Sequence, residues 1–190
     1  MPTPVLHIIA GPNGSGKTTL YERVLDHLAV PFVNADRIAA ERWPDHPQSH
    51  AYEAAQAAQD HRDSLIEGKI SFAAETVFSH ESKIDLVHQA LAAGYDVTLH
   101  VIILPEDLAV QRVADRVRDG GHDVPENKIR ERHRRLWRHI AEAVTLATET
   151  CVYDNSSPDK PLRRVALFQN GRPIGTPEWP VWAPAGLAHL

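Results

Sequence analysis

Short apolar runs alternate along this chain with longer segments in which apolar residues return every three or four positions. Apolar runs bounded by turn residues are typical of buried strands, and the longer spacing is typical of amphipathic helices. Strands are expected at residues 5–10, 30–34, 70–74, 97–104 and 150–153. Helices are expected at residues 19–28, from 37, at 48–67, from 79 or 81 to 93, from 105, and at about 126–149.

The alternation of strands and helices predicts an α/β fold of three layers, with a mostly parallel sheet of about five strands and helices on both faces. Residues 164–168 and 172–174 flank Asn170-Gly171 and have the pattern of a β-hairpin. We expect the 190 residues to form one domain, with the hairpin and an irregular, Pro-rich tail at 163–190. Two tryptophans of this tail, Trp179 and Trp182, are expected to pin it to the body.

The composition narrows the class of protein. Hydrophobic residues make up 43% and charged residues 24%, as in soluble globular proteins. A formal net charge of −5 argues against a nucleic-acid partner, because nucleic-acid-binding surfaces are usually basic. The single cysteine, Cys151, excludes an internal disulfide and a cysteine-based zinc site. No apolar run approaches the ~18 residues of a membrane span and no signal-peptide pattern is visible, so we expect a cytoplasmic protein without a membrane partner.

The segment between the first strand and the first helix matches the phosphate-binding pattern G-x-x-x-x-G-K-[ST] without a mismatch. Its glycines let successive backbone N–H groups point inward, and the helix N-terminus adds its positive end. Lys17 is expected to reach the β- and γ-phosphates, and the Thr18 hydroxyl is expected to bind Mg²⁺. ATP and Mg²⁺ are therefore the expected cofactors. The residues expected to bind ATP here are Gly11, Pro12, Asn13, Gly14, Ser15, Gly16, Lys17, Thr18 and Thr19.

Polar side chains follow three of the other predicted strands: Asp36 the second, Glu75 and Thr76 the third, and Asn155 the fifth. Because open α/β sheets bind ligands at the carboxyl ends of their strands, we expect these residues near the P-loop. Asp36 is interpreted as the base that accepts a proton from a substrate hydroxyl, as the N-cap of the following helix, or as both. Glu75 orients substrate, supports the Mg²⁺ shell, or is a surface carboxylate at the end of a strand. Asn155 either lines the adenine pocket or belongs to a plain turn.

Arginines accompany a Gly-Gly turn after the fourth strand. Arg112 and Arg116 lie four residues apart on one helix face, and Gly120-Gly121 interrupts that helix. This pattern is typical of a lid, here at about residues 112–130, whose arginines stabilise charge on a transferring phosphoryl group. The alternative is a solvated basic face, which we prefer for much of the basic run that follows. That run contains Lys128, Arg130, Arg132, Arg134, Arg135 and Arg138.

Six motifs occur in order along the chain: GPNGSGKTT at 11–19, NADRIA at 34–39, AAETVFS at 73–79, GYDVTLHVI at 94–102, RVADRVRDGGHDVPENKIRERHRRL at 112–136 and YDNS at 153–156. The set resembles the zeta-toxin family of P-loop small-molecule kinases, over roughly residues 5–156. The resemblance implies a P-loop NTPase fold like those of adenylate kinase and chloramphenicol phosphotransferase. It also implies transfer of the ATP γ-phosphate to a hydroxyl, which in the toxins is the 3′-hydroxyl of UDP-N-acetylglucosamine. A small antitoxin protein that blocks the ATP site is the implied partner.

The resemblance also implies roles for individual residues. Lys17 and Thr18 match the residues that bind phosphate and Mg²⁺. Asp36 matches the catalytic base of the family, and Glu75 matches a glutamate that contacts the substrate. Thr76, beside Glu75, is expected to contact the substrate as well.

The lid departs from the family pattern. Arg112 or Arg116 matches one lid arginine, but a second lid arginine of the larger toxins falls on or near His122, which is neutral or only partly charged near pH 7. His122 is expected to contact the substrate from this position. The chain is also shorter than the larger toxins through the substrate-binding part, so the acceptor is open. We expect an ATP- and Mg²⁺-dependent kinase of a small hydroxylated molecule. The alternatives are a nucleotide-dependent protein that engages protein or RNA without phosphoryl transfer, and a kinase for a nucleoside, sugar acid or antibiotic.

Overall fold

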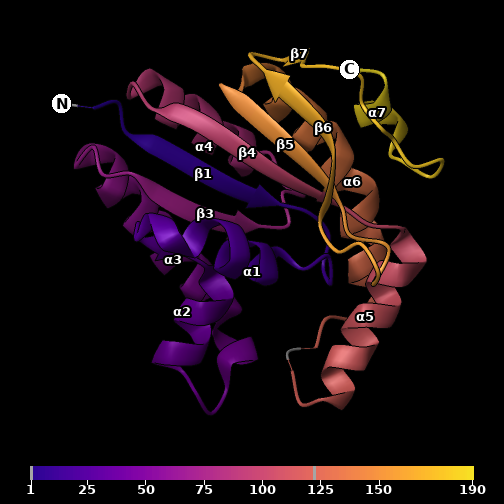
Figure 1. Ribbon diagram of the computed structural model, residues 1–190. Helices are drawn as coiled ribbons and strands as arrows, with labels where there is room; N and C mark the ends of the chain where they lie inside the picture. Colours follow the sequence, from indigo (N-terminus) through magenta and orange to yellow (C-terminus); the bar gives the residue numbers. More distant parts are fainter. Residues whose placement is uncertain (1, 122) are drawn as a thin grey trace.

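The computed structural model describes residues 2–121 and 123–190 and has a seven-stranded sheet at its centre (Figure 1). The strand order is β2-β3-β1-β4-β5-β6-β7, and the first five of these strands are parallel. The parallel strands are β1 (Val5–Ala10), β2 (Phe32–Val33), β3 (Phe72–Thr76), β4 (Asp96–Ile103) and β5 (Glu149–Asp154). The predicted α/β fold with a mostly parallel sheet is confirmed.

The predicted hairpin is present as β6 (Arg163–Gln169) and β7 (Arg172–Pro173). Asn170 and Gly171 form its two-residue turn, and both have positive φ, as the tight turn of a hairpin requires. The prediction of about five strands is wrong because the hairpin joins the sheet. β6 pairs antiparallel with β5 and so continues the sheet beyond its parallel part.

The helices follow the predicted order with shifted ends. The predicted helix at 19–28 begins earlier, as α1, and continues through a π-helical turn at Tyr21–Leu25 and a 3₁₀ turn at Asp26–Leu28. The predicted helix at 48–67 begins with a separate 3₁₀ turn, Pro47–His50, because proline suits a first helical position. The α-helices are α1 (Lys17–Leu20), α2 (Ala35–Arg42), α3 (Ala51–Glu67), α4 (Ser82–Ala92), α5 (Glu106–Arg118), α6 (Glu126–Leu146) and α7 (Ala185–Ala188).

Apolar residues fill both faces of the sheet, as a three-layer fold requires. Neighbouring residues of a strand point to opposite faces, and Ile8 and Ile9 of β1 accordingly belong to different cores. Ile8 lies in the larger core, where α3, α4, α6 and α7 contribute residues such as Leu136. Ile9 packs on the other face with Leu20 and with the turns that follow α1.

The register of the parallel strands brings their carboxyl ends to one edge. Ala10, the last residue of β1, pairs with Thr76 of β3 and with Val101 of β4. Ile103 of β4 pairs with Asp154 of β5. The segments that follow β1, β3, β4 and β5 therefore leave the sheet at the same edge, where open α/β sheets bind their ligands.

The tail is tied to the body largely as expected. Trp179 and Trp182 pack against the larger core, and the ring of Trp179 lies 6.5 Å from the ring of Phe168. The N–H of Glu178 donates to the carbonyl oxygen of Val165 at 2.7 Å. Most of the tail is irregular, but α7, which the sequence pattern did not predict, buries Leu187 against the core.

Candidate active site

The P-loop leaves the carboxyl end of β1 and leads into α1. Gly14 and Gly16 have φ angles of 73° and 91°, a left-handed conformation that glycine adopts without steric cost. A Cβ at Gly16 would lie 2.7 Å from Nδ2 of Asn155, so the close approach of that side chain also requires glycine. The hydroxyl of Ser15 is buried and has no hydrogen-bond partner among the described residues. This loop therefore has an unused donor for a phosphate oxygen.

Asn155 braces the P-loop from the end of β5. Its Nδ2 donates to the carbonyl oxygen of Ser15 at 2.8 Å, and its Oδ1 accepts from the N–H of Leu162 at 3.1 Å. Its own N–H donates to the carbonyl oxygen of Ile103 at the end of β4. The structure thus places Asn155 against the backbone of the P-loop. The predicted contact of Asn155 with ATP stays a prediction.

Lys17 is buried and points back along the P-loop. Its Nζ donates to the carbonyl oxygen of Pro12 at 3.1 Å and lies 3.9 Å from Oε1 of Glu75. Burial lowers the pKa of Lys17, while the carboxylates of Glu75 and Asp36 act in the opposite direction. An anion bound beside this ammonium would stabilise its charged form further. The environment of Lys17 is therefore suited to a phosphate group.

Glu75 connects the P-loop to Asn34, which follows β2. Its Oε2 accepts a hydrogen bond from the Thr18 hydroxyl at 3.0 Å and another from Nδ2 of Asn34 at 2.9 Å. Its side chain is 11% exposed, so Glu75 is not the surface carboxylate of the alternative interpretation. The neighbouring Thr76 uses its hydroxyl to accept from the N–H of Phe78 at 3.1 Å. The end of β3 is thereby held next to α1.

Asp36 lies in the first turn of α2, and its carboxylate is not the helix cap. Asn34 is the N-cap, since its Oδ1 accepts from the N–H groups of Asp36 and Arg37 at 2.8 and 3.2 Å. The interpretation of Asp36 as an N-cap is wrong because the helix begins at Ala35, before the predicted start at Arg37. The Asp36 side chain is exposed and lines the cavity in front of the P-loop.

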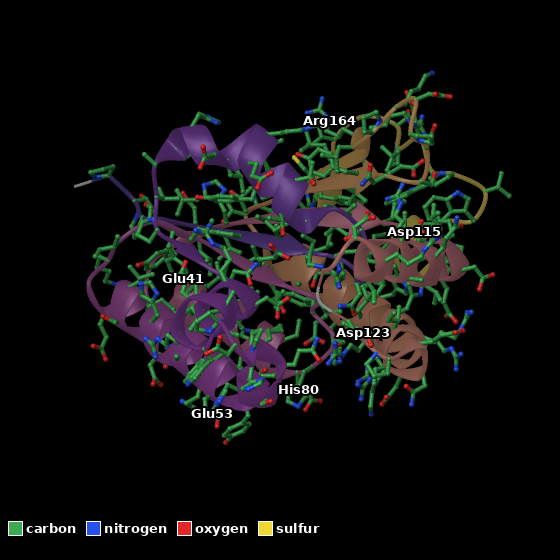
Figure 2. All side chains as sticks on the ribbon, turned by 90° about the horizontal axis from the view of Figure 1, so that it is seen from below. Glu41, Glu53, His80, Asp115, Asp123 and Arg164 are labelled. Carbon is green, nitrogen blue, oxygen red and sulfur yellow. The ribbon has the colours of Figure 1, made fainter. Side chains whose placement is uncertain are left out.

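A cavity of about 530 Å³ connects these groups. Its walls come from the P-loop, α2, α3, the end of β3, the start of α4, α5 and α6. Figure 2 views the molecule from below, with Glu41 of α2 on one side and Asp115 of α5 on the other. Two carboxylates, Asp36 and Glu75, line this cavity. Six cationic side chains of the described residues also line it: Lys17, Arg37, Arg62, Lys83, Arg116 and Arg132.

The lid arginines occupy different places. Arg116 lines the cavity, and it lowers the pKa of Lys17 together with Arg132 of α6. Arg112 is not among the described residues that line the cavity; its Cβ would lie 3.2 Å from a Cβ built at Gly14. Gly121 gives the chain room to pass Arg116, because a Cβ there would lie 2.6 Å from Cγ of that arginine. The predicted substrate contact of His122 falls outside the described residues.

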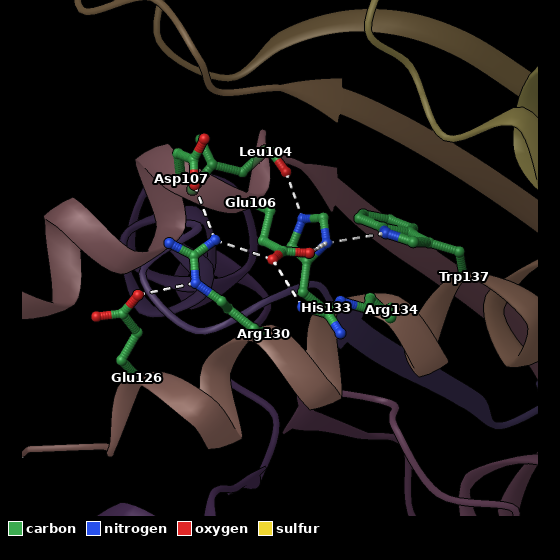
Figure 3. A network of polar contacts seen from close by, with 8 residues as sticks. All are labelled: Leu104, Glu106, Asp107, Glu126, Arg130, His133, Arg134 and Trp137. Atoms are coloured by element: carbon green, nitrogen blue, oxygen red, sulfur yellow. Dashed lines mark hydrogen bonds and ion pairs between the residues drawn. The ribbon is translucent and has the colours of Figure 1, made fainter.

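The N-terminal turns of α5 and α6 are joined by a polar network (Figure 3). Arg130 of α6 donates to Glu106 and Asp107 at the start of α5 and to Glu126 on its own helix, at 2.8 to 2.9 Å. His133 donates from Nε2 to the carbonyl oxygen of Leu104, directly after β4, at 2.8 Å. These contacts fix where α6 starts relative to the sheet. They also direct the charge of Arg130 to neighbouring carboxylates rather than to the cavity.

Comparison with known proteins places the chain in a family. The sequence profile of the family described as "Zeta toxin" matches residues 1–160. The chain belongs to the zeta toxin family. No curated protein sequence is significantly similar to it.

Several solved structures share the fold of this zeta toxin family member. A chain of the AvrRxo1-ORF1:AvrRxo1-ORF2 complex with sulphate ions has a TM-score of 0.71 at 17% identity, over 90% of this chain and 60% of that one. A chain of the PezAT chromosomal toxin–antitoxin system of Streptococcus pneumoniae has a TM-score of 0.65 at 13% identity, over 88% and 72%. A gluconokinase from Sinorhizobium meliloti 1021 has a TM-score of 0.52 at 16% identity, over 83% and 86%. The chain thus spans about 60% of the AvrRxo1 chain. The chain therefore combines membership of the zeta toxin family with a fold that solved kinase structures share.

Four cationic residues of the cavity were not predicted from the sequence: Arg37, Arg62, Lys83 and Arg132. Arg132 was assigned to the solvated basic face, although it lines the cavity from α6. Arg62 lies in the Ala-rich helix α3 and Lys83 lies in the first turn of α4, where both match a solvent-facing pattern. The signal that distinguishes Arg62 is its position: it follows the buried Ala54 and Ala58 at intervals of four, on the same helix face. An arginine on an apolar stripe faces the interior of the fold.

The end of the P-loop offers oxygen ligands for Mg²⁺, but too few to surround the ion with protein groups alone. The hydroxyl of Thr18 and the carboxylate of Glu75 lie together at the P-loop, and Mg²⁺ prefers such hard oxygen ligands. No group of three or more His, Cys, Asp or Glu side chains among the described residues is arranged to hold a metal ion. This fits Mg²⁺ bound partly by substrate phosphates, as is usual for that ion.

In the described part of the chain, no helix is long and apolar enough to cross a membrane.

Proposed function

We propose that this protein is a phosphotransferase, which moves the γ-phosphate of ATP, with Mg²⁺, to a hydroxyl group of a small molecule. The observation that carries the proposal is that Lys17, Thr18 and Asp36 line one cavity of about 530 Å³. The P-loop and the carboxylate of Asp36 therefore border the same space, where a phosphate donor and an acceptor hydroxyl could lie side by side. Glu75 lies between them and bonds to Thr18 on one side and to Asn34, the cap of the helix that carries Asp36, on the other.

The residues divide into donor and acceptor groups. The P-loop backbone and Lys17 would hold the β- and γ-phosphates, and Thr18 would bind Mg²⁺ with Glu75 beside it. The ion would neutralise charge on the phosphate oxygens. Arg116 and Arg132, which line the same cavity, would stabilise charge on the transferring group. Arg112, packed beside Gly14, remains a candidate for the donor side.

Asp36 is the proposed base. Its carboxylate would orient the acceptor hydroxyl and accept its proton as the oxygen attacks the γ-phosphorus. The N-cap at Asn34 fixes the first turn of α2, so the position of Asp36 depends on Glu75, which accepts from Asn34. An acidic group that is exposed to the cavity and held by its helix is suited to this role.

We propose a UDP-amino sugar as the acceptor class, on the resemblance to the zeta toxins, and a small antitoxin protein as the partner. Two findings support these assignments. The excess of cationic side chains in the cavity suits an anionic acceptor such as a nucleotide sugar. The structure of PezAT, with the same fold, is described as a toxin–antitoxin system.

Transfer is tested with γ-labelled ATP, Mg²⁺ and a metabolite extract, followed by identification of labelled products. A labelled small molecule that appears with the wild-type protein and not with Asp36→Asn supports the proposal. ATP binding without any labelled metabolite, together with ATP-dependent capture of RNA or a protein, would favour a nucleotide-dependent binding protein. A labelled product without a nucleotide would keep the kinase and replace the acceptor class.

A further inference from the structure

Arg62 is a buried cation on the wall of the cavity. Only 7% of the residue is exposed, yet it lines the same cavity as the P-loop. Its terminal Nη2 donates to Oε1 of Gln59, one turn earlier on α3, at 2.6 Å. Its Nε is buried and has no hydrogen-bond partner among the described residues. The guanidinium therefore has a donor left over in a place that water reaches poorly.

No carboxylate of the described residues forms an ion pair with Arg62. The adjacent Asp63 is engaged elsewhere: its Oδ1 accepts from Nε2 of Gln59 at 2.8 Å and from Nε2 of Gln89 of α4 at 3.2 Å. The partner of Arg62 is thus a neutral amide oxygen. Burial lowers the pKa of Arg62, and although the carboxylate of Asp63 raises it through its charge, Asp63 forms no ion pair with the guanidinium and does not cancel the effect of burial. A buried cation whose direct partner is neutral is costly to the fold, and such groups cluster at functional sites.

Lys83 adds a second cation to the same wall. It is half-buried in the first turn of α4, and its ammonium forms no hydrogen bond or ion pair with any other described side chain. Burial lowers the pKa of Lys83, and the nearby positive charge of Arg62 lowers it further. Burial likewise lowers the pKa of Arg62. Two cations that repel each other share one wall, and an anion between them would relieve both.

Arg62 and Lys83 line the cavity from α3 and α4, whereas Lys17 lines it from the start of α1, after the P-loop. The charged side chains with the largest effect on Lys17 are Glu75, Asp36, Arg116 and Arg132. Lys83 instead responds to Arg62. The cavity therefore has one cationic group around Lys17 and another formed by Arg62 and Lys83. Asp36 lines the cavity with both groups, so an acceptor hydroxyl at Asp36 leaves the rest of its molecule free to reach the second one.

We propose that Arg62 and Lys83 form an anion subsite that holds a phosphate or diphosphate group of the acceptor. The guanidinium offers directed donors and the ammonium a compact charge, a combination suited to phosphate oxygens. The inference rests on the proposed function, since the subsite selects among acceptors of that reaction. It predicts that a sugar carrying a phosphate or diphosphate is a far better acceptor than the same sugar without one.

The test measures inorganic phosphate binding by calorimetry, with the P-loop saturated by Mg²⁺ and a non-hydrolysable ATP analogue and also without the analogue. The variants are Arg62→Gln and Lys83→Gln. Each should weaken phosphate binding about tenfold, the loss expected for one charge-assisted hydrogen bond. The controls are Arg42→Gln and Lys128→Gln, which remove exposed cations that do not line the cavity. Affinity for the analogue should stay the same in all four variants.

The outcomes separate this inference from the proposed function. Equal phosphate affinity in Lys83→Gln and Lys128→Gln overturns the subsite, even if Arg62→Gln fails to fold. Absence of analogue binding overturns the proposed function, while the titrations without analogue still decide the subsite. A second arm compares turnover of a nucleotide sugar, the matching sugar 1-phosphate and the neutral sugar. Equal kcat/KM for the three acceptors contradicts the inference, and a higher KM of Lys83→Gln confined to the phosphorylated acceptors supports it.

Discussion

The Thr18 hydroxyl donates a hydrogen bond of 3.0 Å to Oε2 of Glu75, which also accepts from Nδ2 of Asn34. Through these contacts one carboxylate connects the start of α1, the end of β3 and the cap of α2. Lys17 is paired with the same carboxylate at 3.9 Å. The donor side and the acceptor side of the site are therefore positioned by a shared group.

Glu75→Gln should disturb both sides. The substitution removes the counter-charge of the buried Lys17 while retaining one acceptor oxygen, so we expect the unfolding free energy to fall by about 2 kcal/mol. Phosphoryl transfer should fall by about 10²-fold, because charged and hydrogen-bonded groups at the site lose their alignment. Urea denaturation and labelled-ATP assays measure the two effects. Glu41→Gln, which removes an exposed partner of Arg37, should change stability by less than about 0.5 kcal/mol. Wild-type stability and activity in Glu75→Gln would contradict the shared role.

Asp36→Asn should separate catalysis from ATP binding. Because the amide cannot accept a proton, transfer should fall by about 10² to 10⁴-fold, the usual contribution of a general base. The affinity for Mg²⁺·ATP should change little, since Asp36 lies on the acceptor side. Single-turnover transfer and equilibrium ATP binding give the two values. Full transfer activity in this variant would remove Asp36 from the role of base.

Lys17→Ala should impair ATP binding as well as phosphoryl transfer. The substitution removes the ammonium expected at the β- and γ-phosphates, so ATP binding should weaken strongly and transfer should be abolished. The variant removes a buried cation that is costly to desolvate, but it also takes away the counter-charge of Glu75, which keeps its hydrogen bonds from Thr18 and Asn34. We therefore expect a folded protein of reduced stability. Circular dichroism checks the fold and calorimetry measures ATP affinity. ATP binding at wild-type strength would show that the P-loop does not hold the nucleotide.

Asn155→Ala should loosen the P-loop without removing any group expected to touch a phosphate. The variant loses the hydrogen bond to the Ser15 carbonyl and the one from the Leu162 N–H, so ATP affinity should fall by about tenfold. A matched variant, Asn127→Ala, removes an exposed asparagine at the start of α6 and should leave ATP affinity unchanged. Calorimetry distinguishes the two. Identical ATP affinity in the two variants would mean that ATP binding does not depend on the hydrogen bonds of Asn155 to Ser15 and Leu162.

His100 should make stability depend on pH. Burial lowers its pKa to about 3 from the ordinary 6.5, and its ring faces His7 of β1 at 3.3 Å and Tyr153 of β5. The unfolded chain therefore binds a proton at His100 between about pH 6.5 and 3 while the folded chain does not. Stability is complete above this window and should fall by about 1.4 kcal/mol per pH unit as the pH drops through it.

Urea denaturation from pH 7 to pH 4 measures the slope. His100→Phe keeps a ring between His7 and Tyr153 and should reduce the slope, leaving a part that comes from His7, whose pKa is also lowered by burial. His88→Gln removes an exposed histidine of α4 and should retain the full slope. An unchanged slope in His100→Phe would exclude His100 as its origin.

Local sequence determined the P-loop and the order of the elements. The eight residues at 11–18 are contiguous, and the apolar strand before them and helix after them are set by the same short stretch of chain. The rule that ligands bind at the carboxyl ends of parallel strands was sufficient to bring Asp36 and Glu75 to the P-loop. These inferences needed the order of strands and helices but no side-chain positions.

Packing decided what the sequence pattern left open. Asn34 rather than Asp36 caps α2 because the helix begins at Ala35, and Asn155 supports the P-loop because β5 ends beside it. The hairpin extends the sheet because β6 pairs with the edge of β5 that β4 does not occupy. Lys83 and Arg132 lie on helices whose charged residues resemble a solvated face, and Arg62 lies on a stripe of α3 that is otherwise apolar. Their place in the cavity follows from how α3, α4 and α6 are rotated against the sheet, and that rotation is set by contacts far apart in the chain.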